Sequence, residues 1–252
     1  MKKIYEMKKL LIIGIICCFG LNAIAQNDLL ILNNERPFGK NLTSNKEIVG
    51  TEFIFPERIE KSYLETESNR ITIELRGLLF GGSFLKNNGQ VVLYDLNNKK
   101  TIWNKSINYQ YYSINQTGKS IFKTGMNKTY CLNFENGENL WKAKNTLAYI
   151  NPELNIGIGH TPYFSGYLFN DNTFEGIDLL TGNSIWEKQI DQTYGLNDIF
   201  MLNDSIAIIV ASGLHSVNLK SGKGWDYNAI TGAPLLREMK TDINSNVLMS
   251  PL

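Results

Sequence analysis

The chain has 252 residues, with 25 lysines and arginines against 24 aspartates and glutamates, and a formal net charge of +1. This near-neutral balance does not favour a nucleic acid or an anionic membrane surface as a partner, because both select basic chains. The chain has 3 cysteines, too few for a disulfide framework, so we expect packing to stabilise the fold.

Residues 1–25 have the pattern of a secretory signal peptide. Lysines precede an apolar run from Leu10 to about Leu21, and small residues then mark a cleavage site before Gln26. The apolar run is shorter than the about 20 residues that span a bilayer, so we expect no transmembrane anchor after cleavage. The pattern therefore predicts export to the periplasm, the cell surface or the medium.

Cys17 and Cys18 lie inside this segment. Bulky isoleucines precede them where lipoprotein cleavage needs small residues. We therefore expect simple cleavage of the signal peptide, with lipidation of one of these cysteines as the alternative. Both cysteines leave with the signal peptide, and Cys131 then remains as the cysteine of the mature chain. We expect Cys131 to be a buried strand thiol, with a reactive or intermolecular thiol as the alternative.

No copy of the repeat described below is visible in residues 26–70. Short strand-like runs occur at Asp28–Leu32 and Glu47–Phe55, separated by the polar loop Asn33–Lys46. The charged stretch Pro56–Arg70 predicts a solvated connection. Because terminal repeats of an array are commonly irregular, we interpret 26–70 as a degenerate first repeat, with an unrelated N-terminal extension as the alternative.

A hairpin pattern that ends on tryptophan occurs four times in residues 71–252. An apolar pair leads into Asp or Asn, a turn rich in Asn, Thr, Ser and Gly follows, and a second run ends on Trp. All 4 tryptophans of the chain occupy this position, at intervals of 38, 45 and 39 residues: Trp103, Trp141, Trp186 and Trp225. A strand-rich repeat of about 40 residues predicts an all-β fold, a β-propeller in which each repeat is one four-stranded blade.

A large side chain at one place in each blade can fill the space between neighbouring sheets. An indole buries roughly 150 to 250 Å² in such a position. We therefore expect the four tryptophans to lie in equivalent slots between neighbouring blades.

The spacing within the repeat also resembles that of the pyrroloquinoline quinone (PQQ)-like propellers, the quinoprotein alcohol dehydrogenase-like group. The best match is the third copy, with Asp178, Thr181, Gly182 and Trp186. The first copy has Asn98 and Lys99 in place of Thr-Gly, and the fourth copy is one residue short before its tryptophan. The resemblance covers about Leu78 to Tyr227. It implies the fold far more strongly than an activity, because it rests on residues that pack blades.

The first clear blade is predicted from Ile71 to Trp103, with strands at ITIEL, LLFGGSFL, VVLYDL and the run that ends on Trp. The pair Gly81-Gly82 predicts a bulge or a close backbone approach, with a ligand loop as the alternative. In the second blade, Gln116–Ser120 resembles a phosphate-binding loop, but Ser113 stands where that motif needs its first Gly. We therefore expect a turn that begins a strand.

Tyrosines and histidines are the other candidate functional residues. Four tyrosines predict an aromatic cluster at a blade junction, with a stacking platform for a sugar or quinone as the alternative: Tyr109, Tyr111, Tyr112 and Tyr130. The two histidines, His160 and His215, fall in different blades without a carboxylate at ligand spacing. They predict neither a metal site nor a catalytic triad, because no nucleophile motif accompanies them.

The end of the chain bears on the number of blades. After Trp225, the run SNVLMSPL resembles the opening strand of a further blade. PQQ-like propellers commonly have seven or eight blades of about 40 residues, whereas this chain has residues for about five to six. We therefore expect an incomplete or truncated propeller in residues 71–252, with its last blade incomplete. An apolar face at the end of the array should be exposed unless a partner covers it.

These patterns favour an exported, non-catalytic binding or scaffolding module that holds a protein, a peptide or a glycan through loops. One alternative is an accessory protein of envelope or outer-membrane assembly. Another is a PQQ-dependent quinoprotein dehydrogenase, in which the resemblance implies PQQ and Ca²⁺ on the axis with a tryptophan beneath the quinone. In this chain the tryptophans are expected to be docking residues between blades. The resemblance would also imply a disulfide between adjacent cysteines against the cofactor, but Cys17 and Cys18 leave with the signal peptide. We therefore predict no enzyme activity, cofactor, metal or catalytic residue.

Overall fold

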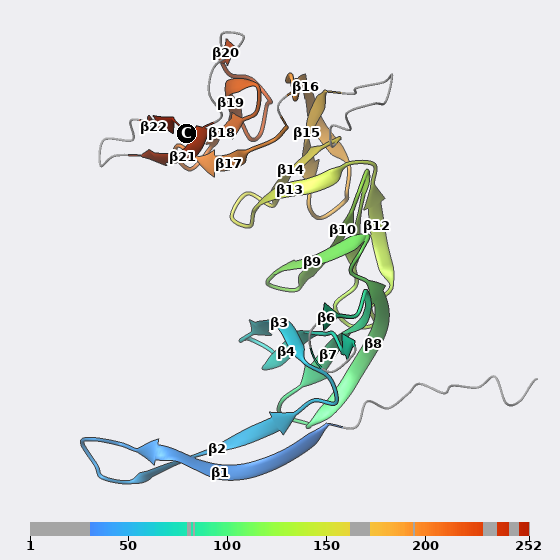
Figure 1. The fold of residues 1–252 in the computed structure, drawn as a ribbon, viewed down its shortest axis with the longest axis vertical. Helices are drawn as coiled ribbons and strands as arrows, with labels where there is room; N and C mark the ends of the chain where they lie inside the picture. Colours follow the sequence, from blue (N-terminus) through green and yellow to red (C-terminus); the bar gives the residue numbers. More distant parts are fainter. Residues whose placement is uncertain are drawn as a thin grey trace, which may run out of the picture. The chain divides into compact units, whose positions relative to one another are not determined.

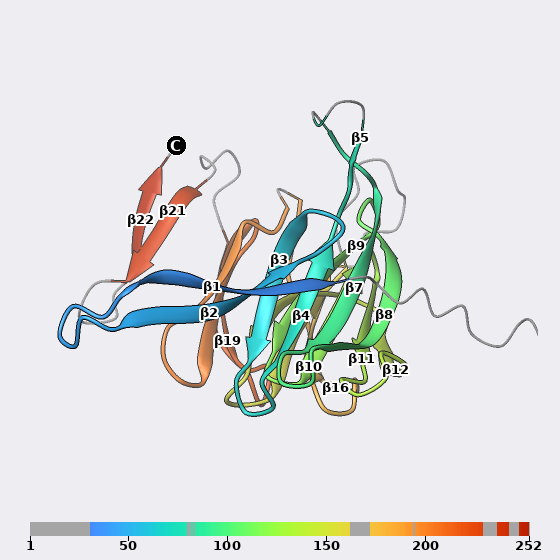
Figure 2. The same ribbon diagram turned by 90° about the horizontal axis from the view of Figure 1, so that it is seen from below.

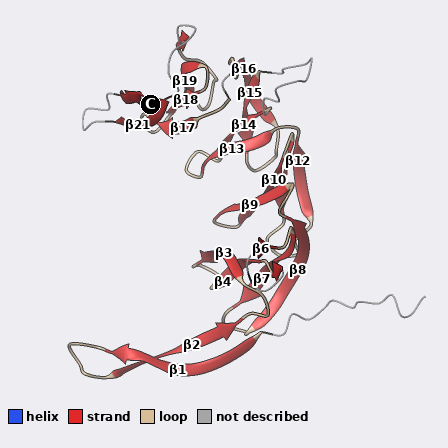
Figure 3. Ribbon diagram, in the orientation of Figure 1, coloured by secondary structure: helices blue, strands red, loops and turns tan. Residues whose placement is uncertain are grey.

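The computed structural model describes residues 31–79, 82, 84–161, 172–193, 195–228, 236–241 and 247–251. Figure 3 draws the described residues as strands and loops, in agreement with an all-β fold. Among them, the structure contains no helix that is both long and apolar enough to cross a membrane. The chain forms two compact units, one up to Ile59 and one from Glu60 onward, and each is described by itself.

The described residues of the first unit form an antiparallel hairpin. Strand β1 (Leu32–Lys40) pairs with β2 (Glu47–Ile54), and Arg36 forms an ion pair with Glu52 at 2.9 Å. The Asn41 side chain accepts hydrogen bonds from two backbone amides of the connecting turn. Residues 33–40, expected to be part of a polar loop, are therefore a strand, because cross-strand pairing satisfies their backbone groups. The interpretation of 26–70 as a degenerate first repeat stays a prediction.

The described residues of the second unit form four four-stranded antiparallel sheets, which we call blades 1 to 4 (Figure 1). In blades 2 to 4 the four strands are consecutive in the chain, whereas in blade 1 a separate strand pair intervenes between the second and third strands. Blade 1 consists of β3 (Ile59–Glu65), β4 (Arg70–Leu75), β7 (Asn88–Asp95) and β8 (Lys100–Asn108). Blade 2 consists of β9 (Tyr112–Thr117), β10 (Ser120–Gly125), β11 (Lys128–Leu132) and β12 (Asn139–Ala143). Blade 3 consists of β13 (Thr146–Asn151), β14 (Ile156–His160), β15 (Thr173–Asp178) and β16 (Ser184–Gln189). Blade 4 consists of β17 (Asp198–Met201), β18 (Ile206–Val210), β19 (Gly213–Asn218) and β20 (Asp226–Asn228).

Two shorter antiparallel pairs belong to the same unit. Strands β5 (Leu78–Leu79) and β6 (Phe84–Leu85) pair with each other between β4 and β7, and Figure 2 shows β5 extending beyond the end of blade 1. Strands β21 (Leu236–Thr241) and β22 (Val247–Pro251) form a two-stranded sheet after blade 4.

The first blade differs from its predicted extent. It begins at Ile59 instead of Ile71, so the prediction of a solvated connection from Pro56 is wrong for β3. The segment was missed because hydrogen bonds support this charged strand. The Tyr63 hydroxyl donates to the carbonyl of Ile114 at 2.9 Å, and the Glu65 carboxylate accepts from the amides of the following turn. The run LLFGGSFL, predicted to be a blade strand, supplies the separate pair β5–β6.

Each blade buries apolar residues against the blade next to it. Three clusters of buried side chains lie between blades 1 and 2, 2 and 3, and 3 and 4, and each draws on both blades of its pair. Between blades 1 and 2, for example, Val91, Leu93 and Trp103 pack with Ile121 and Leu132. Alternation along the strands places the residues of each blade on the face that contacts the other blade. The two sheets therefore remove each other's apolar surface from water.

Candidate functional site

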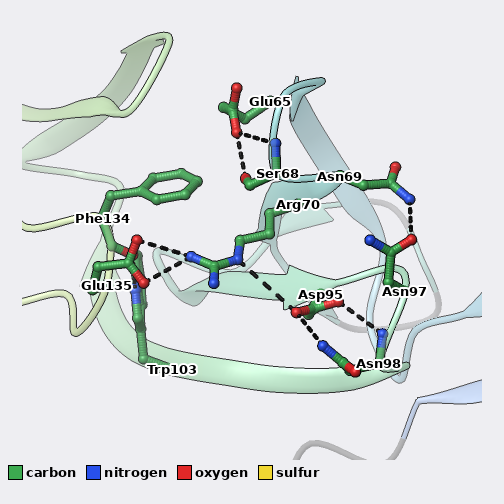
Figure 4. Close-up of polar contacts among 10 residues, drawn as sticks. All are labelled: Glu65, Ser68, Asn69, Arg70, Asp95, Asn97, Asn98, Trp103, Phe134 and Glu135. Carbon is green, nitrogen blue, oxygen red and sulfur yellow. Dashed lines mark hydrogen bonds and ion pairs between the residues drawn. The ribbon is translucent and has the colours of Figure 1, made fainter.

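Three tryptophans join each blade to the next one. The indole N–H of each donates a hydrogen bond to a backbone carbonyl of the following blade: Trp103 to Phe134 at 2.8 Å, Trp141 to Leu179 at 3.1 Å, and Trp186 to Leu219 at 2.5 Å. Figure 4 shows the first of these contacts. In every case the acceptor residue directly follows the Asp or Asn of the next copy of the repeat. The same hydrogen bond therefore joins blade 1 to blade 2, blade 2 to blade 3 and blade 3 to blade 4.

The glycine of the repeat makes room for the docked indole. The accepting turns end on glycines with φ values of 70°, 75° and 70°: Gly137, Gly182 and Gly222. A Cβ atom at these positions would lie 2.9, 2.5 and 2.8 Å from the nearest indole atom. The Asp or Asn at the start of the turn accepts backbone hydrogen bonds, as Asp178 does from Leu180 at 2.8 Å. The repeat is therefore a receptor for the tryptophan of the preceding blade.

The corresponding turn of blade 1 has the same cap but a different last residue. Asp95 accepts a hydrogen bond of 2.8 Å from the Asn98 amide, and Lys99 takes the glycine position with φ 51°. Arg70 joins this turn to blade 2, because its guanidinium lies 4.0 Å from Asp95 and 2.7 Å from Glu135 (Figure 4). Polar contacts thus connect the turns of the first two blades.

The fourth tryptophan has a different environment. Trp225 forms hydrogen bonds with Ser216 on the neighbouring strand of blade 4. In blade 3, Trp186 lies opposite Gly176 in the same way. The two tryptophans therefore have equivalent places in their blades. Yet Trp225 is 50% exposed, against 3% for Trp103 and 8% for Trp186. The prediction of four equivalent slots is therefore wrong for Trp225. In the described part of the chain, no Asx-to-Gly turn follows it.

A cluster of tyrosines and lysines lies on the face of blade 2 that packs against blade 1. We call it the lysine–tyrosine cluster, and it consists of Tyr112, Lys123, Lys128, Tyr130 and Lys142. Lys123 lies opposite Tyr130 in the β10–β11 pair, and Tyr130 lies opposite Lys142 in the β11–β12 pair. Directly opposite residues of antiparallel strands point to the same face, so the register assembles the cluster.

Two ammonium groups approach each tyrosine ring of the cluster. The Lys123 Nζ atom lies 5.1 Å from the ring centroid of Tyr112 and 4.8 Å from that of Tyr130. Lys128 Nζ lies 5.3 Å from the Tyr112 centroid, and Lys142 Nζ lies 5.7 Å from the Tyr130 centroid. Each exposed contact of this kind is worth about 0.5 to 1 kcal/mol, so the rings restrain the lysines.

The lysine–tyrosine cluster is positively charged. None of the ion pairs between described residues includes Lys123, Lys128 or Lys142. A hydrogen bond with Tyr112 raises the pKa of Lys128. Three cations on one sheet face without a described carboxylate partner form a surface that attracts anions.

A cavity of about 190 Å³ lies beside the cluster, between blades 1 and 2. Four buried core side chains lie along its floor: Val91, Ile107, Ile114 and Leu132. Its polar lining includes Lys105, which pairs with Glu138 at 2.6 Å, and Lys123, which also belongs to the cluster. Lys123 thus connects the cavity with the charged surface.

The predicted aromatic cluster is divided in the structure. Tyr112 and Tyr130 meet edge to face, with ring centroids 6.4 Å apart. Tyr109 packs instead below Arg76, whose guanidinium lies 5.0 Å from its ring centroid, and Tyr111 is exposed. The lysines were missed because strand register decides which side chains meet. The spacing of Lys128 and Tyr130, two residues apart on one strand, was the available signal.

A buried carboxyl group lies at the same junction. Glu74 is 2% exposed, and the Tyr63 hydroxyl lies 3.4 Å from its carboxylate. Burial raises the pKa of Glu74, and burial together with the nearby carboxylate raises the pKa of Tyr63 to about 12. Ionisation of Glu74 is therefore less favourable in the folded protein than in the unfolded chain.

We expect Glu74→Gln to remove a pH-dependent loss of stability. Because the pKa of Glu74 is raised on folding, its stabilising contribution is present below the unfolded pKa and is lost as pH rises through the folded pKa. The variant should gain stability relative to the natural protein at pH 8 but not at pH 4. Urea unfolding at both pH values measures this, with the exposed Glu153→Gln as control. An equal difference at the two pH values would contradict the assignment.

The histidines lie in separate blades and have local partners. His160 stacks on Phe174 with ring centroids 5.5 Å apart, and its Nδ1 atom contacts Gln192 at 2.9 Å. Burial lowers the pKa of His160. His215 is buried and its Nδ1 atom contacts Asp226 at 2.9 Å. Among the described residues, no group of three His, Cys, Asp or Glu side chains could hold a metal ion.

The remaining sequence motifs have structural positions. Cys131 is 2% exposed, and burial raises the pKa of its thiol to about 11, which confirms a buried strand thiol. Residues 116–120 form the hairpin turn between β9 and β10, with Gly118 at φ 52°, as expected for a turn that begins a strand. Gly82 has φ 92°, whereas Gly81 lies outside the described residues, as do Cys17, Cys18 and the predicted signal peptide.

Four-stranded antiparallel sheets that follow one another in the chain and join through docked tryptophans define a β-propeller repeat protein. No family model and no curated protein matches the sequence. Solved propeller structures do resemble this chain. One is BamB from Moraxella catarrhalis, with a TM-score of 0.45, 10% identity, and coverage of 79% of this chain and 60% of that chain. Another is the Pan2 WD40 domain of Neurospora crassa, with a TM-score of 0.47, 10% identity, and coverage of 82% and 64%.

Proposed function

We propose that this chain is an exported, non-catalytic propeller module that binds an acidic segment of a partner polypeptide on the lysine–tyrosine cluster. The observation that carries the proposal is Lys123, an ammonium group between two tyrosine rings that pairs with no carboxylate among the described residues. The carboxylates of an acidic peptide would complete the hydrogen bonding of these lysines. The signal-peptide pattern of residues 1–25 supports export.

A peptide fits the cluster better than a neutral glycan. A sugar ring stacks on an open aromatic face, but two ammonium groups approach each of the Tyr112 and Tyr130 rings. An extended acidic segment can instead place alternate side chains on one side, toward the lysines. Opposite charge also speeds association and favours one partner over others.

The positions of the tryptophans support a binding role over a quinone-dependent reaction. Trp103, Trp141 and Trp186 are committed to contacts between blades, so none of these three can lie beneath a quinone without separating two sheets. The Asp-x-x-Thr-Gly pattern of the PQQ-like repeat is used here to receive an indole. Dehydrogenase activity and envelope assembly stay predictions, because no contact between described residues favours either one.

The proposal predicts salt-sensitive binding of acidic peptides. Fluorescence anisotropy with the labelled peptide Glu-Asp-Glu-Asp-Leu-Phe should show binding that weakens between low and high salt, since exposed charges are screened beyond about 10 Å at 0.1 M. Replacing Lys128 and Lys142 together by Gln should weaken binding by about tenfold, equal to about 1.4 kcal/mol.

The control replaces two lysines on a turn of blade 4, Lys220 and Lys223, by Gln. This variant has the same change in net charge but leaves the cluster intact, so its affinity should stay near that of the natural protein. Equal losses in both variants, or equal binding of the neutral peptide Gln-Asn-Gln-Asn-Leu-Phe, would show that overall charge and not the cluster governs binding.

A further inference from the structure

Each docked tryptophan is followed two positions later by a second residue that contacts the next blade: Lys105, Ala143 and Lys188. Lys105 pairs with Glu138 of blade 2 at 2.6 Å, and Lys188 pairs with Asp226 of blade 4 at 2.8 Å. Ala143 belongs to the apolar cluster between blades 2 and 3. Residues two apart on a strand point to the same face. The outer strand of each of blades 1 to 3 therefore offers a contact of two residues to the blade that follows.

Blade 4 carries the same two positions on its outer edge, at Trp225 and Tyr227, which we call the open pair. Asp226 lies between them and contacts Lys188 of blade 3. Because side chains alternate along a strand, the open pair points to the side away from blade 3. Trp225 is 50% exposed and Tyr227 is 58% exposed. The donor half of an interface between blades is therefore present on blade 4 but uncovered.

The exposed apolar surface of blade 4 is confined to this outer edge. In strand β18, Ala207 and Ile209 belong to the cluster shared with blade 3, and the alternating residues Ile208 and Val210 are also fully buried. Strand β18 is thus covered on both faces. Among the described residues of blade 4, the exposed large apolar side chains are those of the open pair. The contact that the open pair lacks is therefore that of an outer hairpin.

The three docked tryptophans define the kind of hairpin that covers such a pair. Each accepting turn begins with Asp or Asn and ends with Gly four positions later, and the carbonyl of its second residue accepts the indole N–H. A Cβ atom on any of these glycines would lie 2.5 to 2.9 Å from the indole. A partner must therefore supply a turn that starts with Asp or Asn and ends with Gly.

The described turns of a second copy of this chain do not meet that requirement. Its three turns of this kind already hold indoles of their own chain. The turn of blade 1 ends on Lys99, with φ 51°, and the β1–β2 turn that Asn41 caps ends on Asn45, with φ 52°. Both residues have a Cβ atom where an indole needs space. The partner is therefore a different polypeptide.

We propose that the open pair docks a β-hairpin of another polypeptide, whose Asp- or Asn-initiated turn ends in Gly and accepts the Trp225 indole N–H. Tyr227 would lie beside the glycine of that turn, as the Lys105 side chain does at Gly137, where its Cε atom lies 3.0 Å from the position of an added Cβ. Covering two half-exposed aromatic rings removes apolar surface from water. This interface is independent of the lysine–tyrosine cluster, because the open pair belongs to blade 4.

The probe is the disulfide-cyclised peptide Cys-Ile-Asp-Leu-Leu-Thr-Gly-Asn-Ser-Ile-Cys. It copies the accepting turn of blade 3, with cysteines in place of the opposite residues Gly176 and Trp186. In NMR spectra of the natural protein, the indole N–H signal of Trp225 is assigned by its loss in Trp225→Phe. The peptide should shift this signal with a dissociation constant of about 1 mM or below, while the signals of the three docked indoles stay in place.

Two matched changes isolate the docking geometry. The same peptide with Ala in place of Gly should bind about tenfold more weakly, because its Cβ atom overlaps the indole. Trp225→Phe keeps an aromatic ring but has no N–H to donate, so anisotropy of the labelled Gly peptide should show binding about tenfold weaker than to the natural protein. Thermal unfolding verifies that the variant folds.

Three results would overturn the inference. The first is a Trp225 signal that does not move at about 5 mM of the Gly peptide, well above the expected dissociation constant. The second is equal binding of the Gly and Ala peptides, since the docked geometry would then differ from that of the other three tryptophans. The third is loss of binding in the variant that replaces Lys128 and Lys142 by Gln, because the hairpin would then occupy the lysine–tyrosine cluster. None of these results bears on acidic peptides, so the proposed function is tested separately.

Discussion

Trp186→Ala is expected to lower the free energy of unfolding by about 3 to 5 kcal/mol, the range measured when large buried aromatic side chains are truncated. The indole is 8% exposed, belongs to the apolar cluster between blades 3 and 4, and donates to the Leu219 carbonyl. Its removal leaves a cavity between two sheets and a buried carbonyl without its donor. Guanidinium unfolding followed by circular dichroism measures the change.

Trp225→Ala is the matched control for this prediction. The residue has the equivalent place in blade 4 but is 50% exposed, so its replacement should lower stability by less than about 1 kcal/mol. Similar losses in the two variants would mean that docking between blades does not account for the stability of the array. Tryptophan fluorescence gives a second reading, because the loss of Trp225 should remove emission from the most exposed indole.

Gly182→Ala is expected to destabilise the protein by about 2 to 5 kcal/mol for two additive reasons. The glycine has φ 75°, a conformation that costs an L-residue about 1 to 2 kcal/mol. A Cβ atom there would also lie 2.5 Å from the Trp141 ring, and relief of such overlap typically costs about 1 to 3 kcal/mol. Denaturant unfolding measures the sum.

Gly118→Ala isolates the backbone contribution. Gly118 has φ 52° in the β9–β10 turn, and no heavy atom lies within 4 Å of the position that a Cβ would take. Its replacement should therefore cost only the backbone part, about 1 to 2 kcal/mol. If Gly182→Ala is no worse than Gly118→Ala, the indole does not require a glycine at the end of the accepting turn.

Much of the fold followed from the repeat because its residues act locally. Asp178 caps its own turn, and Gly182 supplies the left-handed conformation and the space for Trp141. Strand β3 was not predicted, because polar contacts such as the Tyr63 hydrogen bond to Ile114 come from residues 51 positions apart. Charge in the segment before Arg70 therefore indicated a loop where tertiary contacts support a strand.

The candidate site could be predicted only in part. The predicted aromatic cluster at a blade junction had four tyrosines, and of these Tyr112 and Tyr130 do meet edge to face, since aromatic residues in strands favour packing between sheets. The lysines could not be assigned, because a shift of one residue in register moves every side chain to the other face. The pairing of Lys123 with Tyr130 and of Tyr130 with Lys142 decides the charge of that face.

The sequence by itself determined that this is an all-β repeat protein whose turns and tryptophans recur about every 40 residues, because turn chemistry and apolar alternation depend on near neighbours. Tertiary structure alone decided which indoles are buried, where the first blade begins, and which lysines surround the cavity. Those features depend on pairs of residues far apart in the chain. Trp103 is buried because a carbonyl 31 residues later accepts its N–H, and Trp225 is exposed although its local sequence resembles that of its counterparts.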